Sequence, residues 1–435
     1  MRLSLTAASL IIATIPVIAD AQNVWTLDSC INHAVSHNLT VKNREISVAT
    51  SELEVTSAKD AFLPSVSAGV SQTFNFGRGL TSENTYANRN TSNFGWNAGL
   101  QLPLFQGMRR VRTLDYARTN LRMTLEQLES AKDDITLNVI AQYLQVLYCT
   151  EIHNVAVEQL RLSNIELQRR RELLEAGKIA ELDLTQAESQ VAQDELSVVT
   201  ALNDRSIALL DLAQLLELPS SESFEVAELP DSPTAPIPYA SDVYNAAINI
   251  NHSIAASRLG VESAAKAVSV AKSGYLPSLS FTAGVGSSYY KVSGFDNEGF
   301  GPQMRHNLSK SLGFSLNIPI FDAFSTRNSV RRAQVQQLSA RLQLKDTENR
   351  LYKAIAQAHA QATAAEKRME AAAVATRSTQ TALDAMREKY NYGKANATEF
   401  EQARTEYLRA VSTAVQAKYE SLLRRRILSF YASGR

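Results

Sequence analysis

Four short stretches of the chain alternate apolar and polar side chains with a period of two. In residues 65–76, for example, Val66, Ala68 and Val70 share one face, and 93–104, 279–289 and 311–320 repeat the pattern. This period predicts strands with one apolar face, and about ten residues is the length that a tilted membrane strand needs. Aromatic residues gather near both ends of the strands, as in membrane-interface girdles. A soluble sheet edge with core aromatics is the alternative, and four regular strands of this length favour the membrane.

Most of the remaining sequence has the pattern of long helices. Between Arg109 and Ala176 there is no proline or glycine, and apolar residues recur at alternating spacings of four and three. That spacing is typical of coiled-coil packing, and the stretch predicts a helix on the order of 100 Å long. Residues 326–392 match it. Neither stretch is continuously apolar, so both helices are expected to project from the membrane into water.

The chain also contains an internal repeat. Pro64 in "FLPS" matches Pro277 in "YLPS", Pro103 in "LPLF" matches Pro319 in "IPIF", and Gly177 matches Gly393. The order of these landmarks is the same in both halves, so the repeat covers almost the whole chain. The predicted division is a first repeat at 22–218, a proline-rich linker at 219–238 and a second repeat at 239–435. Each repeat is predicted to begin with a helix before its strands. The further predicted elements are strands at about 62–77, 93–104, 275–290 and 311–321, long helices at 109–176 and 326–392, and shorter helices at 181–217 and 397–431.

Each long helix is predicted to end in a tight turn. Gly177 and Gly393 can adopt the left-handed cap conformation, and a new helix begins a few residues later. A lysine follows each glycine (Lys178, Lys394), and an acid stands six residues after the glycine (Asp183, Glu399). Acids at a helix start are explained by the helix dipole. That explanation does not account for the repetition of the whole pattern at both tips.

The N-terminal residues 1–21 have the pattern of a secretory signal peptide, with cleavage before Gln22. An N-terminal anchor is the alternative, although the apolar run is short and contains Pro16. The formal net charge is zero, which argues against nucleic acid as a partner. Two cysteines, Cys30 and Cys149, are too few for a disulfide framework.

No cofactor, metal site or enzymatic activity is predicted. The sequence lacks a glycine-rich phosphate loop, a nucleophile elbow and a cysteine pair. His33 and His37 are four residues apart but have no third ligand nearby in the sequence. Four strands cannot stand alone in lipid, because unpaired edge groups would have no water to bond. Several copies of the chain are therefore expected to close one sheet.

These paired motifs resemble the TolC-type outer-membrane efflux and secretion channels. The resemblance implies a mostly helical chain with a membrane β-barrel portion, a homotrimer with a twelve-stranded barrel in outer-membrane lipid, and a helical tunnel in the periplasm. It also implies that the tips, with Gly177, Lys178 and Asp183 and with Gly393, Lys394 and Glu399, meet a periplasmic adaptor attached to an inner-membrane transporter. Pro64, Pro103, Pro277 and Pro319 would mark the strand–helix junctions. Glu401, Arg404 and Glu406 are candidates, from position, for closing the tunnel end.

One departure from the family concerns the turn after each second strand. The family often has two glycines there, whereas this chain reads "QGM" and "DAF", which predicts a local difference in the turn. Two other functions remain open from the residues alone: an exported coiled-coil assembly without a pore, and a surface binding module that uses the loops at 77–92 and 293–310. The transported substrate is not encoded in any recognisable motif.

Overall fold

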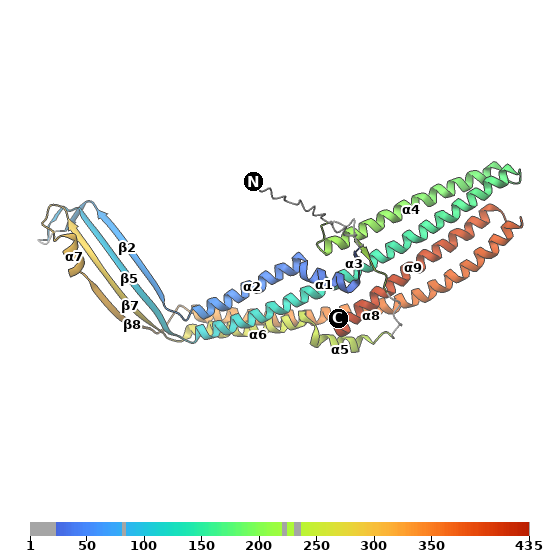
Figure 1. Ribbon diagram of the computed structural model, residues 1–435. Coiled ribbons are helices and arrows are strands. Elements are labelled where there is room, and N and C mark those ends of the chain that lie inside the picture. Colours follow the sequence, from blue (N-terminus) through green and yellow to red (C-terminus); the bar gives the residue numbers. More distant parts are fainter. Residues whose placement is uncertain (1–22, 81–83, 220–223, 230–235, 435) are drawn as a thin grey trace, which may run out of the picture. The chain divides into compact units, whose positions relative to one another are not determined.

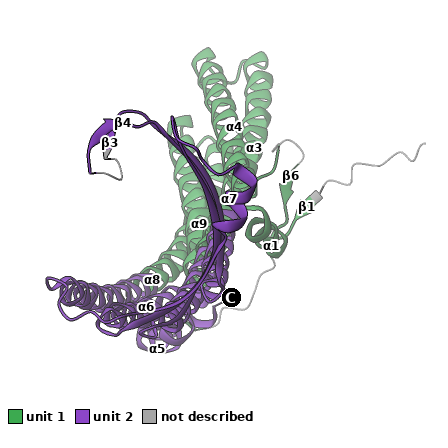
Figure 2. Ribbon diagram, turned by 90° about the vertical axis from the view of Figure 1, so that its left-hand side faces the viewer, with its two compact units in different colours: residues 1–39, 134–237, 360–427 green, residues 40–133, 238–359, 428–435 purple. Residues whose placement is uncertain are grey.

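The computed structural model describes residues 23–80, 84–219, 224–229 and 236–434, so the predicted signal peptide lies outside the described residues (Figure 1). The chain forms two compact units. Unit 1 comprises residues 1–39, 134–237 and 360–427, and unit 2 comprises 40–133, 238–359 and 428–435 (Figure 2). Each unit takes segments from both sequence halves. The repeats are therefore units of sequence and local structure, and the compact units cut across them.

Unit 2 contains a four-stranded antiparallel sheet. Its strands are β2 (Ser65–Asn75), β5 (Thr91–Gln106), β7 (Ser278–Val292) and β8 (Ser309–Asn317), in the spatial order β2-β5-β7-β8. The two halves meet at the centre, where Gly99 lies opposite Gly284. Strands are thus present in all four predicted stretches, although β8 ends earlier than expected and β5 extends further. Among the described residues, β2 and β8 each have one edge without a partner strand.

The apolar face of this sheet is open. Val66 on β2 and Leu312 on β8 are 72% and 78% exposed, and Ile320, just after β8, is 95% exposed. A water-soluble sheet would cover such a face, because exposed apolar area of this extent is unfavourable in water. The alternation predicted from the sequence is therefore present, and its apolar side is not covered within the described chain.

The four prolines do not occupy equivalent places. Pro64 and Pro277 stand directly before β2 and β7, and Pro319 follows β8. Pro103, by contrast, lies inside β5, which continues to Gln106 past a shift of register between Pro103 and Phe105. β5 therefore extends two residues beyond its predicted end at Leu104. Proline has no N–H for the ladder, so the strand accommodates it with an irregularity instead of ending there.

The turns that lead from the sheet to the long helices have the same backbone in both halves. Gly107 and Met108 have φ of 58° and 63°, and their counterparts Ala323 and Phe324 have φ of 52° and 64°. The two copies therefore form the same turn, and the local difference from the family's two-glycine pattern stays a prediction. Both copies place two successive residues in the left-handed region, and the second copy does so without glycine, at a steric cost.

Helices pack next to the sheet in unit 2 through two equivalent clusters. α2 (Leu39–Asp60) contributes Val55 and Ala58, which pack with Ala117 of α3. α6 (His252–Lys272) contributes Val268 at the position equivalent to Val55, and it packs with Val330 and Ala333 of α8. α3 (Arg109–Glu175) and α8 (Ser325–Asn391) are the two long helices, with 67 residues each. The repeat is thus reproduced in side-chain packing as well as in backbone.

Unit 1 is built from two helical hairpins and a small parallel strand pair. α4 (Glu181–Leu215) returns along α3, and α9 (Ala397–Ser433) returns along α8. β1 (Asn23–Trp25) pairs with β6 (Phe224–Val226), which lies in the predicted linker. The Tyr143 hydroxyl on α3 donates to the carbonyl oxygen of Ala227 at 2.6 Å and lies 3.1 Å from that of Trp25. One buried phenol therefore fixes the strand pair to the long helix.

The helix predicted before the strands of each half is divided in two: α1 (Leu27–His37) precedes α2, and α5 (Ala240–Ile250) precedes α6. Other short elements have no counterpart among the predictions: the hairpin β3 (Arg78–Leu80) with β4 (Tyr86–Asn88), a 3-10 turn at Ser273–Tyr275, and α7 (Phe300–His306) between β7 and β8. Within the described residues, no helix is long and apolar enough to cross a membrane.

Candidate functional site at the helical hairpin tips

The two hairpin tips have nearly the same hydrogen bonds. At the first tip, the N–H of Gly177 donates to Leu174 O (2.8 Å) and that of Lys178 to Leu173 O (2.9 Å). At the second tip, Gly393 donates to Tyr390 O (3.0 Å) and Lys394 to Lys389 O (2.8 Å). Both patterns are Schellman caps, which need a left-handed residue at the glycine. Gly177 and Gly393 have φ of 67° and 69°, so the cap geometry follows the sequence expectation.

The two repeated acids at the tips cap the returning helices. Asp183 accepts a hydrogen bond from Ala180 N (3.3 Å) through its side chain. Glu399 accepts from Asn396 N (2.9 Å), and Asn396 in turn accepts from Glu399 N (2.8 Å), which completes a capping box. Local helix capping therefore accounts for both carboxylates. Lys178 and Lys394 are exposed, and they leave a cation at the outer surface of each tip.

A buried polar cluster lies between the hairpins of unit 1. The guanidinium of Arg404 on α9 lies 3.0 Å from the carboxylate of Asp194 on α4, and it donates to the hydroxyl of Ser163 on α3. Ser163 also donates to Asp194, and Gln190 donates to the other Asp194 oxygen at 3.0 Å. All three helices thus meet at one buried ion pair. A buried charge without its partner is strongly unfavourable, so the cluster holds the helices in one arrangement.

A second arginine extends this cluster toward the tips. Arg170 on α3 is only 1% exposed; its guanidinium lies 3.2 Å from Glu166 and 3.4 Å from Glu401, and it donates to the carbonyl oxygen of Asp183 at 3.1 Å. Glu401 also lies 3.2 Å from Arg404. Glu401 therefore bridges the two arginines. The first tip is connected in this way to the buried ion pair.

Tyr390 completes the cluster beside the second tip. Its ring stacks on Phe400 with centroids 5.2 Å apart, and the guanidinium carbon of Arg170 lies 5.7 Å from its centroid. Burial raises the pKa of Tyr390, an effect that the nearby Arg170 partly offsets. The phenol therefore stays neutral at physiological pH.

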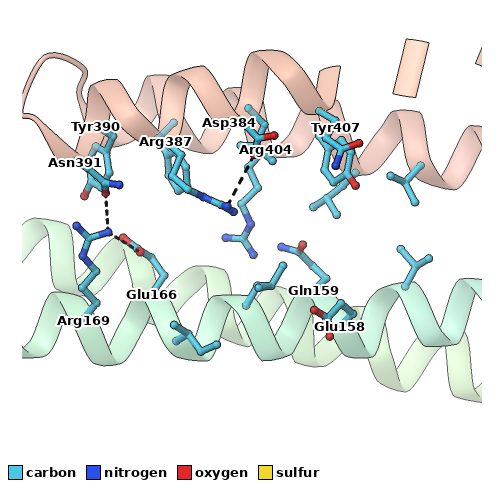
Figure 3. Close-up of a pocket in the computed structure, with 18 of the residues that line it drawn as sticks. Glu158, Gln159, Glu166, Arg169, Asp384, Arg387, Tyr390, Asn391, Arg404 and Tyr407 are labelled. Atoms are coloured by element: carbon cyan, nitrogen blue, oxygen red, sulfur yellow. Dashed lines mark hydrogen bonds and ion pairs between the residues drawn. The ribbon is translucent and has the colours of Figure 1, made fainter. Parts of the chain in front are cut away.

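An open groove runs beside the cluster between α3 and the pair α8–α9 (Figure 3). Its volume is about 760 Å³, and its walls mix apolar residues such as Leu162 and Leu383 with charged ones. Near the tips, Arg169 donates to Asn391 across the groove at 2.8 Å. The lining of the groove thus mixes apolar and charged side chains from three helices.

The predicted gate residues have different surroundings. Glu401 and Arg404 lie in the cluster just described, whereas Glu406 is exposed and has no contact with it among the described interactions. Sequence reasoning missed Arg170, Ser163 and Asp194. Each lies on a regular helical stretch and is brought to Glu401 or Arg404 only by the packing of the hairpins.

The histidine pair of α1 lies elsewhere in unit 1. The rings of His33 and His37 stack with centroids 4.1 Å apart, and Trp25 packs edge-on against His33. Burial, followed by the neighbouring His37, lowers the pKa of His33. In the described part of the chain, no group of three or more histidine, cysteine or acidic residues could hold a metal ion.

Comparison with known proteins identifies the class. The sequence profile of the outer membrane efflux protein family matches residues 30–217 and 243–432, so each half matches separately. The chain belongs to the outer membrane efflux protein family, and it is an outer-membrane exit duct with a periplasmic helical part. This is a family of transport channels and not of enzymes. The assembly protein without a pore, considered above, is not favoured.

Individual relatives are distant but extend over most of the chain. The outer membrane efflux protein BepC of Brucella suis biovar 1 (strain 1330) is 23% identical over 421 residues, which cover 96% of this chain and 87% of BepC. The outer membrane protein TolC of Escherichia coli (strain K12) is 23% identical, covering 79% of this chain and 72% of TolC. The CmeC outer membrane channel of Campylobacter jejuni has a similar fold, with a TM-score of 0.77 and 16% identity, covering 93% of this chain and 85% of CmeC.

Proposed function

We propose that three copies of the chain form one duct, in which β8 of each copy pairs with β2 of the next. The free edges of β2 and β8 carry this proposal, because unpaired backbone groups at a sheet edge are costly in lipid. The exposed apolar face would contact lipid, and the serine-, glycine- and asparagine-rich face would line the passage. Substrate would move passively through it, driven by the inner-membrane partner.

The internal repeat supplies the register of the proposed contact. Inside one chain, Gly99 of β5 lies opposite Gly284 of β7. Using the spacing of the proline landmarks, the corresponding residues in the other half are Ser315 of β8 and Ser71 of β2. If the contact between copies repeats the contact within a copy, Ser315 lies opposite Ser71 of the neighbouring copy. Side chains on one face of a strand recur every two residues. A cross-link between Ser71 and Ser315 therefore also tests that both residues lie on the same face of the closed sheet.

The test is a cysteine cross-link. Ser71→Cys and Ser315→Cys are combined in a chain in which Cys30 and Cys149 are replaced by alanine, and membranes are oxidised. We expect disulfide-linked dimers and trimers on denaturing gels, and discrete conductance steps from the purified protein in a planar bilayer. Each single variant is the matched control and should give monomer. Absence of cross-links from both this pair and the pair Ser71→Cys with Gly313→Cys, two residues away, would reject the proposed closure.

The hairpin tips are the proposed contact with a periplasmic adaptor that is attached to an inner-membrane transporter. The geometry that supports this is the shared cap at Gly177 and Gly393, which presents Lys178 and Lys394 outward at equivalent places. We expect Lys178→Glu with Lys394→Glu to weaken co-purification with the adaptor of the host efflux system. Lys353→Glu, on the exposed side of α8, is the matched control and should leave co-purification unchanged.

The buried cluster is proposed to keep the tunnel end closed. Arg170, Glu401 and Arg404 join α3 to α9, and their contacts must break before the two hairpins of a chain can separate. Glu406 has no such contacts among the described interactions, so this structure gives less support to its proposed role in closing the tunnel end. Opening would then require an external source of free energy, which the adaptor contact at the tips is placed to supply.

A further inference from the structure

Beyond Gly286, the edge of β7 that faces β8 is covered by side chains instead of by a strand. β8 pairs with β7 only as far as Gly286, opposite Ser309. Beyond that point, Asn307 donates to Ser288 O (2.7 Å), Gln303 accepts from Tyr290 N (2.9 Å) and donates to Tyr290 O (3.0 Å), and Asn297 does the same for Val292 (2.9 and 2.8 Å). Three amide side chains thus substitute for a missing strand.

These hydrogen bonds fix α7 over the apolar face of the sheet. The ring of Phe300 lies 5.4 Å from that of Phe94 and 5.2 Å from that of Tyr289. Phe94 and Tyr289 are opposite each other in the register, and they alternate onto the same face as Trp96 and Val285. Figure 2 shows α7 on the convex side of the curved sheet. In a closed duct, that side faces the membrane.

Cations gather on this same face at the end of the sheet away from the helices. Lys291 follows Tyr289 by two residues, so it shares the outward face of β7. Lys310 lies opposite Val285, so it shares the outward face of β8, just beyond Leu312. Arg305 is exposed on α7 itself. None of the three has an acidic partner among the described interactions, whereas Glu298 is engaged with His306 at 2.8 Å.

Exposed aromatic side chains accompany the cations. Phe295 is 64% exposed and Phe300 is 51% exposed, although both lie in a segment fixed by hydrogen bonds. Aromatic rings next to cations at the end of an apolar band are typical of the layer where acyl chains meet lipid headgroups. Since the family places this chain in the outer membrane with its helices in the periplasm, this end of the sheet lies at the outer leaflet.

We infer that α7 and its flanking strands form a binding surface for the phosphate groups of anionic membrane lipids, contacted by Lys291, Arg305 and Lys310. Phe295 and Phe300 insert among the acyl chains beside them. The surface continues the lipid-facing side of the sheet outward, and its unpaired positive charge matches phosphate. The inference rests on the membrane location and on the proposed closure of the duct, but on neither the adaptor contact nor the closing of the tips.

The experiment measures lipid binding to the purified full-length protein by native mass spectrometry in a neutral detergent. Dioleoyl phosphatidic acid is compared with dioleoyl phosphatidylcholine, which has the same acyl chains and no net charge. We expect about tenfold tighter binding of phosphatidic acid, because each cation near an anionic lipid surface favours binding. This preference should fall severalfold in 0.5 M salt, since contacts between exposed charges are screened.

Variants identify the residues. The triple variant Lys291→Gln, Arg305→Gln, Lys310→Gln should lose the preference, whereas Arg341→Gln, Lys353→Gln, Arg377→Gln, which removes three exposed cations from α8, should keep it. The double variant Phe295→Ser, Phe300→Ser should weaken the binding of both lipids equally. An equal affinity of the unaltered protein for the two lipids, or a preference retained by the first triple variant, would overturn the inference. Conductance of the same preparations separates this outcome from a failure of the duct.

Discussion

The two halves of the chain have the same backbone geometry but different buried chemistry. Both contain a left-handed two-residue turn, a long helix, a Schellman cap and a returning helix. The cluster around Arg404, however, has no duplicate. The position equivalent to Arg404 in the first half is Glu188, which is exposed and pairs with Arg171 at 3.4 Å, and the position equivalent to Asp194 is Ala410. Duplication therefore accounts for the scaffold, whereas the ion pair joins Arg404 of the second half to Asp194 of the first and has no second copy among the described residues.

The largest expected effect comes from breaking this asymmetric cluster. Arg404→Ala leaves Asp194 buried without its cation and should lower the free energy of unfolding by about 3–5 kcal/mol. Glu188→Ala, at the equivalent exposed position, should cost about 1 kcal/mol or less. Chemical denaturation of the purified protein compares the two variants.

The same variants test the proposed closing of the tunnel end. Replacing the pair together, as Arg404→Met with Asp194→Leu, removes the charges without leaving one unpaired, so it should restore much of the stability. We expect a larger single-channel conductance from this double variant than from the unaltered protein. An unchanged conductance in a stable double variant would show that the cluster serves stability alone.

The turns before the long helices offer the next largest difference. A Cβ atom at Gly107 would lie 2.6 Å from Leu276 Cβ and 2.7 Å from Ser273 O, so Gly107→Ala should destabilise by roughly 2–4 kcal/mol. Ala323 has the equivalent conformation with a Cβ already present, so Ala323→Gly should stabilise by about 1 kcal/mol. Thermal unfolding in detergent measures both. A loss of stability in Ala323→Gly would mean that its left-handed backbone is not strained.

Cys30 and its equivalent Val243 differ in whether they ionise. Burial raises the pKa of the Cys30 thiol from its ordinary value of 9.0 to about 12. The folded state favours the neutral thiol. The contribution of this thiol to the free energy of unfolding is therefore fully present below pH 9 and is lost as the pH rises toward 12. By pH 10 the loss should be about 1.4 kcal/mol. In Cys30→Val this loss should disappear in denaturation experiments between pH 8 and 10; an unchanged slope would place its origin in other groups.

The smallest difference concerns the starts of the returning helices. The second tip has Asn396 as its cap, and the first has Ala180, whose side chain cannot accept a hydrogen bond. Asn396→Ala should therefore cost about 1 kcal/mol, and Ala180→Asn should add a similar amount to the stability. Equal stabilities of Ala180→Asn and the unaltered protein would indicate that the first tip is already satisfied by Asp183 alone.

The sequence predicted those features that depend on local periodicity or on one residue type. The strand alternation and the long helices follow from side-chain spacing, and the caps at Gly177 and Gly393 follow from the freedom of glycine. The left-handed turn at Ala323 and Phe324 was not predictable, because surrounding packing imposes a conformation that these residues do not prefer. The short element α7 was missed because seven residues held by amide side chains have no detectable period.

The candidate site was predictable only in part. Glu401 and Arg404 were chosen by their distance from the tip, and both lie in the buried cluster. Their partners Arg170 and Asp194 are more than 200 residues away in the chain, and each looks like an ordinary solvent-facing residue of a helix in the sequence. Such pairs depend on how the hairpins pack, which a single sequence does not reveal.

The two free sheet edges have a consequence for biogenesis. Because β2 and β8 are different strands, the contact that we propose between copies is head-to-tail, and a contact of this kind either closes into a ring or continues as an open filament. An isolated chain therefore has an unpaired strand at each edge of its sheet, and each of these strands can pair with another copy. The curvature of the sheet sets how many copies close the ring. If insertion into the membrane is delayed after export, the free edges can add further copies and form a filament. A periplasmic chaperone that covers one sheet edge would be enough to prevent both ring closure and filament growth before insertion.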